Sequence, residues 1–176
     1  ILCAILGGLL LKDHLSIPSR HLVIFYTSNL RGQINPFQGE VSDRVYEKAG
    51  GLAFLRGLID DTMKMYRIDP KRALLVDTGD SLFGSPEAAL TMGEVPFELL
   101  QKVGYDAIAI GNLEFEFGLD TLRRFISTKK LPMLACNYRD LASPVGNTFQ
   151  GGIILDKGGV RVGVIGLGMI DLARNT

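Results

Sequence analysis

Apolar runs of strand length alternate along this chain with helix-length segments, and this alternation limits the possible folds more than any other feature. The run HLVIFYT at residues 21–27 is rich in β-branched and aromatic residues, which is typical of a strand buried in a sheet. Further strands are predicted at residues 73–78, 106–112 and 131–138. Helices are predicted between them at residues 52–66, 95–103 and 119–128. The pattern favours an α/β domain with a largely parallel sheet.

Two further segments complete the predicted domain. Residues 28–51 are polar and carry glycine and proline, and we expect a loop there that is long enough to serve a functional or docking role. Residues 151–169 predict a hairpin of two strands about a turn at Lys157–Gly159.

Composition excludes several classes of protein. The 176 residues are close to the size of one domain, and 47% hydrophobic content is enough for a core. Lys and Arg number 19, as do Asp and Glu, so no basic excess favours a nucleic-acid partner. The two cysteines, Cys3 and Cys136, are too few for a disulfide framework or a cysteine-rich zinc site. The chain has only two histidines, His14 and His21.

The N-terminal residues 1–11, ILCAILGGLLL, are all apolar or glycine. As a helix they would rise about 16 Å, whereas a full membrane span needs about 20 residues. No A-x-A pattern for signal cleavage follows, and charged residues end the run abruptly at Lys12. We therefore predict an uncleaved apolar membrane helix, with residues 1–20 as anchor and linker and residues 21–176 as the domain. The alternative is a buried helix of the domain itself.

Polar residues follow three of the predicted strands at the place where ligands gather in α/β sheets. The strand ends read TSNLRG at residues 27–32, VDTGD at 76–80 and IGNLE at 110–114. Carboxylate and amide oxygens beside glycine indicate a metal or phosphate site. Each motif taken alone is also typical of a loop whose carboxylates cap nearby amides.

The order and spacing of the motifs resemble those of a known family. The segments YTSNLRGQINP, AGGLAFLRGLIDD, LLVDTGDSLFGSP and GNLEFEFGLDTL are similar to its successive motifs, and LPMLACNY and VRVGVIGLGMID to the strands after them. The family is that of the 5′-nucleotidases and UDP-sugar hydrolases, within the calcineurin-like metallophosphoesterases. The resemblance covers about residues 22–171 and implies the N-terminal half of a metallophosphoesterase-like sandwich.

The resemblance implies a two-metal centre that binds phosphate and activates water, but the ligand positions are degenerate here. The family's Asp-x-His falls on Asn29 and Arg31, and its catalytic His falls on Leu113. Its bridging Asp and its Asn are kept as Asp80 and Asn112. Arginine stays protonated in proteins and leucine has no donor atom, so neither can replace a histidine ligand. We expect no catalytic residue, no metal and no other cofactor.

The positive charge of Arg31 suggests two roles. We predict that its guanidinium replaces the metal and pairs with Asp80, because a buried carboxylate without a partner is costly. The alternative is that Arg31 binds an anion such as phosphate or a nucleotide.

Other residues are interpreted as structural. Glu114 and Glu116 are expected in a solvated loop, and Cys136 is expected to be inert in a buried strand. Gly166 and Gly168 predict a glycine turn after a strand rather than a dinucleotide-binding turn.

These observations predict a catalytically inactive, membrane-anchored domain that serves as a structural or docking subunit of a membrane complex. The partners would be the membrane, through residues 1–11, and other subunits of that complex. The domain would lie on the periplasmic or extracellular side. The alternatives are a metal-dependent, 5′-nucleotidase-like phosphoesterase with altered ligands and a non-catalytic anion binder.

Overall fold

The computed structural model describes residues 21–41, 43–128, 130–139 and 148–170. The predicted anchor and linker at residues 1–20 lie outside this part of the chain. Among the described residues, no helix has the length and apolar character needed to cross a bilayer.

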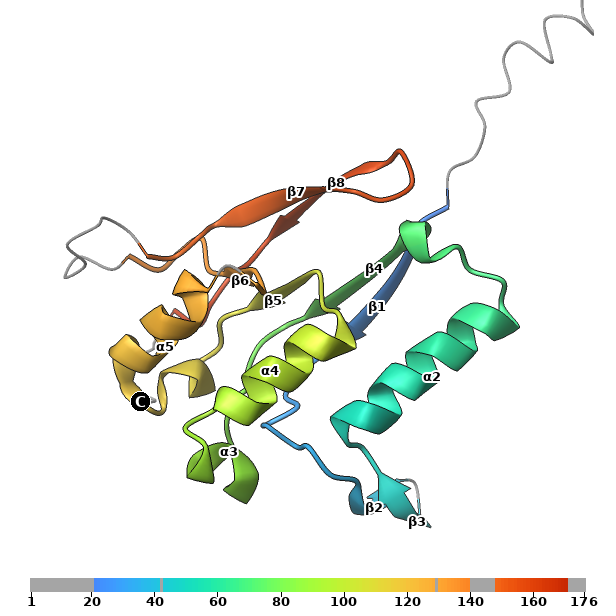
Figure 1. Cartoon of the computed structure of the whole chain (residues 1–176), viewed down its shortest axis with the longest axis horizontal. Coiled ribbons are helices and arrows are strands. Elements are labelled where there is room, and N and C mark those ends of the chain that lie inside the picture. Colours follow the sequence, from blue (N-terminus) through green and yellow to red (C-terminus); the bar gives the residue numbers. More distant parts are fainter. Residues whose placement is uncertain (1–20, 42, 129, 140–147, 171–176) are drawn as a thin grey trace, which may run out of the picture.

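Four parallel strands form the central sheet, as the alternation predicts. In spatial order they are β1 (Val23–Thr27), β4 (Ala73–Asp77), β5 (Ala107–Ala109) and β6 (Met133–Leu134). Thr27 pairs with Asp77, and Asp77 pairs with Ile108. The carboxyl ends of β1, β4 and β5 therefore lie side by side, and the loops that leave them share one edge of the sheet (Figure 1).

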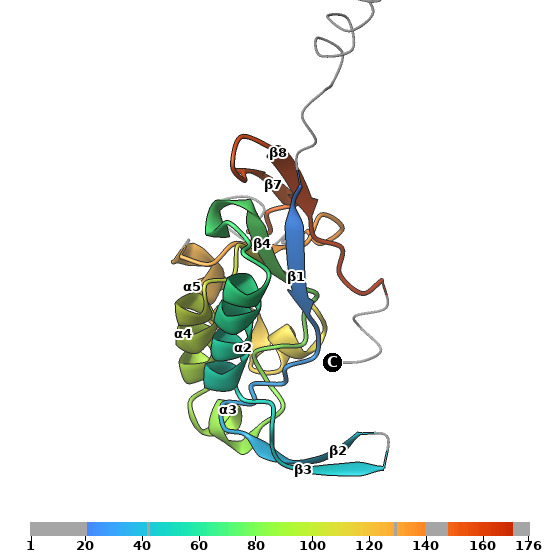
Figure 2. The same ribbon diagram turned by 90° about the vertical axis from the view of Figure 1, so that its right-hand side faces the viewer.

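Three helices cover one face of this sheet. They are α2 (Leu52–Met65), α4 (Glu94–Val103) and α5 (Gly118–Ser127), all close to their predicted bounds (Figure 2). Leu100 and Leu122 of the helices pack with Ile108 of the sheet in a core that water does not reach. Gly104, in the left-handed conformation, ends α4, which is a common way for a helix to stop.

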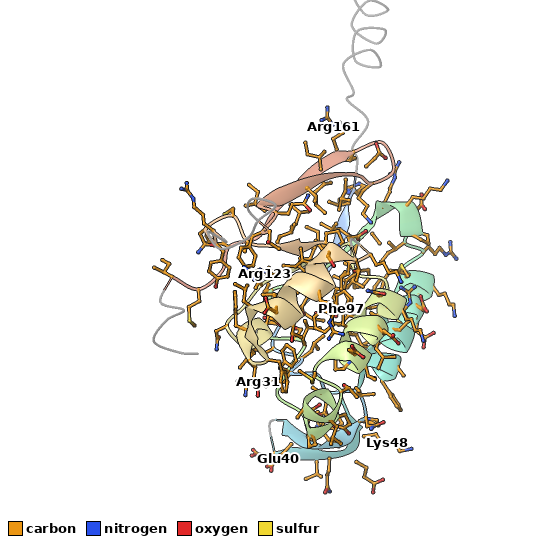
Figure 3. The ribbon with its side chains drawn as sticks, turned by 60° about the vertical axis from the view of Figure 1, so that its left-hand side comes forward. Arg31, Glu40, Lys48, Phe97, Arg123 and Arg161 are labelled. Atoms are coloured by element: carbon orange, nitrogen blue, oxygen red, sulfur yellow. The ribbon has the colours of Figure 1, made fainter. Side chains whose placement is uncertain are left out.

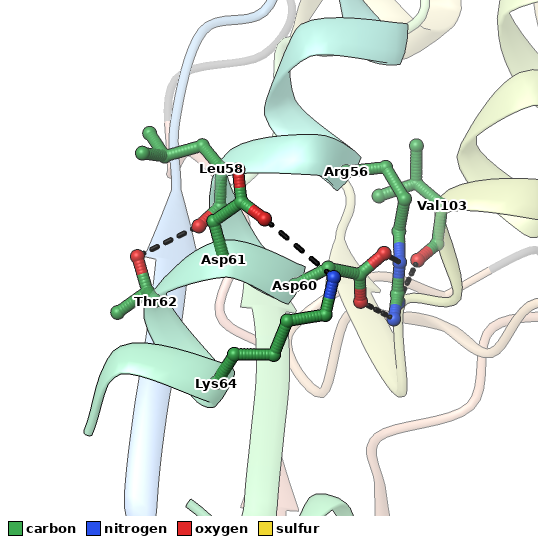
Figure 4. Close-up of polar contacts among 7 residues, drawn as sticks. All are labelled: Arg56, Leu58, Asp60, Asp61, Thr62, Lys64 and Val103. Carbon is green, nitrogen blue, oxygen red and sulfur yellow. Dashed lines mark hydrogen bonds and ion pairs between the residues drawn. The ribbon is translucent and has the colours of Figure 1, made fainter. Parts of the chain in front are cut away.

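Arg56 joins two of the helices, as Figure 4 shows. Its Nη1 donates to the carbonyl oxygen of Val103 at the end of α4 over 2.8 Å, and its Nε donates to Asp60 of α2 over 3.1 Å. One side chain thus satisfies an orphan carbonyl of α4 while it is held by a carboxylate one turn further along its own helix.

The opposite face of the sheet carries exposed apolar side chains. Ile24 and Tyr26 of β1 are 55% and 75% exposed. Since alternate side chains of a strand point to opposite faces, a helical layer on one face leaves these two uncovered. The prediction of a buried strand is therefore wrong for Ile24 and Tyr26.

The segments outside the sheet differ more from prediction. The expected loop at residues 28–51 contains an antiparallel hairpin, β2 (Phe37–Val41) with β3 (Arg44–Ala49). A short helix, α3 (Pro86–Leu90), was not expected; Ser85 caps its first turn. The predicted C-terminal hairpin is confirmed as β7 (Gly152–Asp156) and β8 (Arg161–Ile165). The chain leaves β5 and β6 after three and two residues, so the predicted strands at 106–112 and 131–138 are too long.

Candidate functional site

Backbone hydrogen bonds join the loops that follow β1 and β4. The amides of Asn29, Arg31 and Gly32 donate to the carbonyl oxygens of Gly79, Asp80 and Ser81 over 3.1, 3.0 and 2.8 Å. Two of the predicted site positions on the first loop therefore lie beside a third, Asp80, on the second. The sequence prediction that these strand ends converge is confirmed.

Three of the five predicted site residues have a strained backbone. Asn29, Arg31 and Asp80 have φ angles of 54°, 52° and 57°, in the left-handed region that non-glycine residues rarely adopt. Such strain persists only where surrounding contacts hold it, and it is concentrated at functional sites. Here the hydrogen bonds between the two loops supply those contacts.

Glu114 is the organising residue beneath these loops. It lies in the short 3-10 helix η2 (Leu113–Phe115) and is only 1% exposed. Its carboxylate accepts four backbone N–H groups, which we call the Glu114 cage. The donors are Asp80 at 3.0 Å, Ser81 at 2.7 Å, Leu82 at 3.2 Å and Gly111 at 2.8 Å. Burial raises the pKa of Glu114, and the four donors offset part of that rise.

The expectation that Glu114 belongs to a solvated loop is wrong. A lone carboxylate is stable at this depth because four amides, from loops far apart in sequence, replace its water. Glu116, two residues on, is exposed as expected. Both glutamates lie between apolar residues, so the local sequence carries no signal that separates the buried Glu114 from the exposed Glu116.

Asp77, at the end of β4, is a second buried carboxylate; it was not among the predicted site residues, but it caps a nearby amide, as one interpretation of this strand end had it. It accepts from Thr27 Oγ1 at 2.5 Å, Gly79 N at 2.8 Å and Ser81 Oγ at 2.6 Å. The Tyr105 hydroxyl lies 2.7 Å from Thr27 Oγ1 and donates to it, since the Thr27 proton is used on Asp77. Burial raises the pKa of both Asp77 and Tyr105.

Glycine permits the close approach of the loops after β4 and β5. A Cβ on Gly111 would lie 2.2 Å from Asp80 Oδ1, and a Cβ on Gly79 would lie 2.8 Å from the Gly111 nitrogen. Both distances are below any normal contact. The contact between these two strand ends therefore depends on the absence of side chains there.

The side chains of Asn29, Arg31, Asp80, Asn112 and Leu113 form what we call the site rim. Asp80 Oδ1 accepts from the backbone nitrogen of Leu113 over 3.0 Å, so the loop after β5 reaches the other two. The side-chain Nδ2 of Asn29 donates to Ser28 Oγ over 2.7 Å. All five predicted positions thus belong to one edge of the sheet, but the Leu113 side chain packs partly against the core.

Arg31 does not pair with Asp80. No ion pair within 4.0 Å joins Arg31 to a carboxylate among the described residues. Its side chain is exposed in the lower part of the molecule in Figure 3, and its Cβ lies close to Gly84. The left-handed backbone of Arg31 and this contact direct the side chain outward, and the ion-pair prediction is corrected accordingly.

The rim residues do not fit a two-metal centre. Such a centre draws on several carboxylates and imidazoles, whereas this rim offers one carboxylate, two amides, a guanidinium and an aliphatic side chain. Within the described residues, no three His, Cys, Asp or Glu side chains are grouped so that they could hold a metal ion.

Two other interpretations are resolved outside the rim. Cys136 is exposed, not buried as expected. Gly168 exchanges two hydrogen bonds with the Asn137 side chain, and a Cβ on Gly166 would lie 2.2 Å from the Leu134 carbonyl oxygen. The glycine turn after β8 is therefore explained by packing.

Known proteins share this architecture. No protein-family model matches the chain. Over 124 residues, 70% of the chain, it is 36% identical to a 5′-nucleotidase of Vibrio vulnificus. The structure matches that of a 5′-nucleotidase precursor from Thermus thermophilus with a TM-score of 0.74 and 25% identity, over 86% of this chain and 29% of that one. A calcineurin-like phosphoesterase from Bacillus subtilis matches with a TM-score of 0.64 over 89% of this chain and 51% of that one, at 24% identity.

The fold is therefore that of a calcineurin-like phosphoesterase. Within that class, the chain is related to the N-terminal part of the 5′-nucleotidase family, as its motifs indicate. It spans 22% of the length of the Vibrio relative.

Proposed function

We propose that this chain is a pseudoenzyme, a catalytically inactive metallophosphoesterase-like domain held at a membrane by residues 1–11. It acts as a structural or docking subunit of a membrane complex, on the periplasmic or extracellular side. The observation that carries this proposal is the site rim. Asn29, Arg31 and Leu113 occupy positions that the family resemblance assigns to metal ligands and to the catalytic histidine.

The electrostatics of the rim support inactivity. Asp80 is the one carboxylate of the rim, and one of its oxygens already accepts the Leu113 amide. Arg31, on the neighbouring loop, offers no ligand atom to a divalent cation, because a guanidinium stays protonated. A metal-activated water and a general acid therefore both lack the side chains they require.

The uncovered sheet face supports a docking role. On the face away from the helices, Ile24 and Tyr26 of β1 are 55% and 75% exposed. Exposed apolar side chains on a sheet face indicate a surface that another protein segment covers. The formal charge of zero makes nucleic acid an unsuitable partner.

The test is the metal content of the native protein, measured by elemental mass spectrometry together with identification of the chains that copurify. We expect no stoichiometric divalent metal and a fixed set of membrane partners. The triple substitution Asn29→Asp, Arg31→His, Leu113→His restores the family's residue types on the same backbone. It is expected to raise the affinity for Mn²⁺ in a calorimetric titration.

Two results would replace the proposal. About two metal equivalents per chain, with hydrolysis of nucleotides, would establish a phosphoesterase whose remaining ligands come from outside this sequence. Binding of inorganic phosphate that is lost in Arg31→Gln would establish an anion-binding site instead.

A further inference from the structure

The two ends of the domain differ in charge. At one end, the last turn of α2 is followed by the short helix η1 (Pro70–Arg72), which leads into β4, and the turn between β7 and β8 lies on the same side. Figures 1 and 2 place η1 and the turn between β7 and β8 beside the start of β1, and the segment after α2 leads to η1. A Cβ on Gly158 of the turn would lie 2.7 Å from Arg72 Cγ, so the two segments are in contact.

Four cations of this end have no carboxylate partner. No ion pair joins Arg67, Lys71, Arg72 or Arg161 to an acidic residue in the part of the chain that the structure describes. The other two cations nearby are neutralised: Lys157 pairs with Asp106 at 2.6 Å, and Lys64 pairs with Asp61 at 3.7 Å. Figure 4 shows the second pair.

The carboxylates of this end are already used by backbone groups. Asp69 accepts from the Lys71 nitrogen at 3.0 Å, and Asp156 accepts from the Gly159 nitrogen at 3.0 Å. Four unpaired cations against these two carboxylates leave the end basic. Met65 and Tyr66 stand beside them, 74% and 70% exposed. We call these six residues the basic end: Met65, Tyr66, Arg67, Lys71, Arg72 and Arg161.

The far end carries no such excess of positive charge. The β2–β3 hairpin carries three acidic residues and two basic ones between residues 37 and 49. Figure 3 labels Arg161 at one end of the molecule and Glu40 and Lys48 at the other. A negatively charged surface would therefore attract the basic end and not the hairpin.

The sequence places the basic end close to the proposed anchor. Residues 12–20 join the apolar run 1–11 to His21, just before β1, and nine residues extend at most about 32 Å. Basic side chains bind anionic headgroups, and tyrosine is favoured at the level of the headgroups.

We propose that the basic end is a docking surface for an anionic lipid bilayer, which orients the domain with its site rim away from the membrane. This inference rests on the proposed anchoring by residues 1–11. The occupant is the headgroup layer of the membrane that holds the anchor. The phosphate groups of the lipids pair with the four cations while Met65 and Tyr66 enter the interface.

The 176-residue chain contains no tryptophan, so a single reporter can be introduced. We would reconstitute Tyr66→Trp and, as the control at the far end, Tyr46→Trp into vesicles of phosphatidylcholine with and without phosphatidylglycerol. Lipids brominated near the headgroup quench tryptophan fluorescence on contact. Tyr66→Trp should be quenched in the anionic vesicles, less so in high salt, and Tyr46→Trp should not be quenched.

Matched charge variants test the electrostatic part. The double variant Arg67→Gln, Lys71→Gln should bind the vesicles roughly thirtyfold more weakly, since the loss of each basic residue near an anionic surface weakens binding about five- to sixfold. Arg44→Gln with Lys48→Gln removes the same two residue types from the hairpin and should change nothing.

The failures are distinguishable. Flotation of the vesicles in a density gradient reports whether the chain is anchored. If the chain floats with the vesicles but the two tryptophan reporters are quenched equally, or neither is quenched, the docking surface is refuted and the anchor stands. If quenching of Tyr66→Trp is equal in vesicles without phosphatidylglycerol, the lipid charge plays no part and the proposal is overturned. If the chain does not float with either kind of vesicle, the anchor fails, and the docking surface fails with it.

Discussion

The Glu114 cage and the site rim lie at the same edge of the sheet, yet they differ in how completely their polar groups are satisfied. The cage uses one buried carboxylate to bind four amides from two loops. At the rim, the positions where the family resemblance expects metal ligands hold an exposed Arg31 and an exposed Asn29, whose side-chain amide donates to the neighbouring Ser28. The difference teaches that the architecture of a strand-end site can be kept by its buried layer while the exposed layer loses the chemistry.

The sharpest test of this comparison is Glu114→Gln. The side-chain NH2 group of the glutamine cannot accept a hydrogen bond from the backbone N–H groups that it would face. We therefore expect the free energy of unfolding to fall by about 3 kcal/mol or more. Glu116→Gln is the same substitution at an exposed position and should stay within about 0.5 kcal/mol. Urea unfolding of both variants decides the matter, and equal effects would mean that the cage does not stabilise the fold.

The close approach of the loops gives the next largest effect. Gly111→Ala would drive a methyl group into Asp80, and we expect a loss of about 2 kcal/mol in unfolding free energy. Gly57→Ala is the control, because nothing lies within 4 Å of a Cβ there and the residue sits inside α2. It should stabilise the protein by about 0.5–1 kcal/mol. A neutral Gly111→Ala would contradict the tight contact.

The buried carboxylate Asp77 should make stability depend on pH. Because burial raises its pKa in the folded state, the unfolded chain ionises first as the pH rises through about 3.9. Between the unfolded and the folded pKa, the unfolding free energy of the native protein should therefore fall relative to that of Asp77→Asn. The total fall should be about 1.4 kcal/mol for each unit by which the two pKa values differ. Unfolding of both proteins across this range measures the difference. A constant difference would show that the folded and unfolded pKa values are equal.

The smallest effect is expected at the rim. Arg31→Gln removes an exposed side chain that forms no ion pair, so the unfolding free energy should change by less than about 0.5 kcal/mol. Arg56→Gln, which breaks the link from α2 to the end of α4, should cost about 1 kcal/mol. Thermal unfolding compares the two. A larger loss for Arg31→Gln would show that Arg31 stabilises the rim after all.

Sequence reasoning succeeded where the information is local. The three long helices follow from apolar spacing and glycine stops, and the C-terminal hairpin from its turn. The order of glycine-containing strand ends is enough by itself to place Asn29, Asp80 and Asn112 at one edge.

The tertiary structure alone decided the features that depend on which groups surround a side chain. Glu114 and Glu116 look alike in sequence, yet one lies at the core and the other in water. Three of the four amides that replace water around Glu114 come from residues more than 30 positions away. The outward direction of Arg31 was likewise set by the left-handed backbone that two paired loops hold in place. Local pattern determined the elements and the chemistry available at their ends, whereas long-range hydrogen bonding determined which charges are buried, which are paired and which face the solvent.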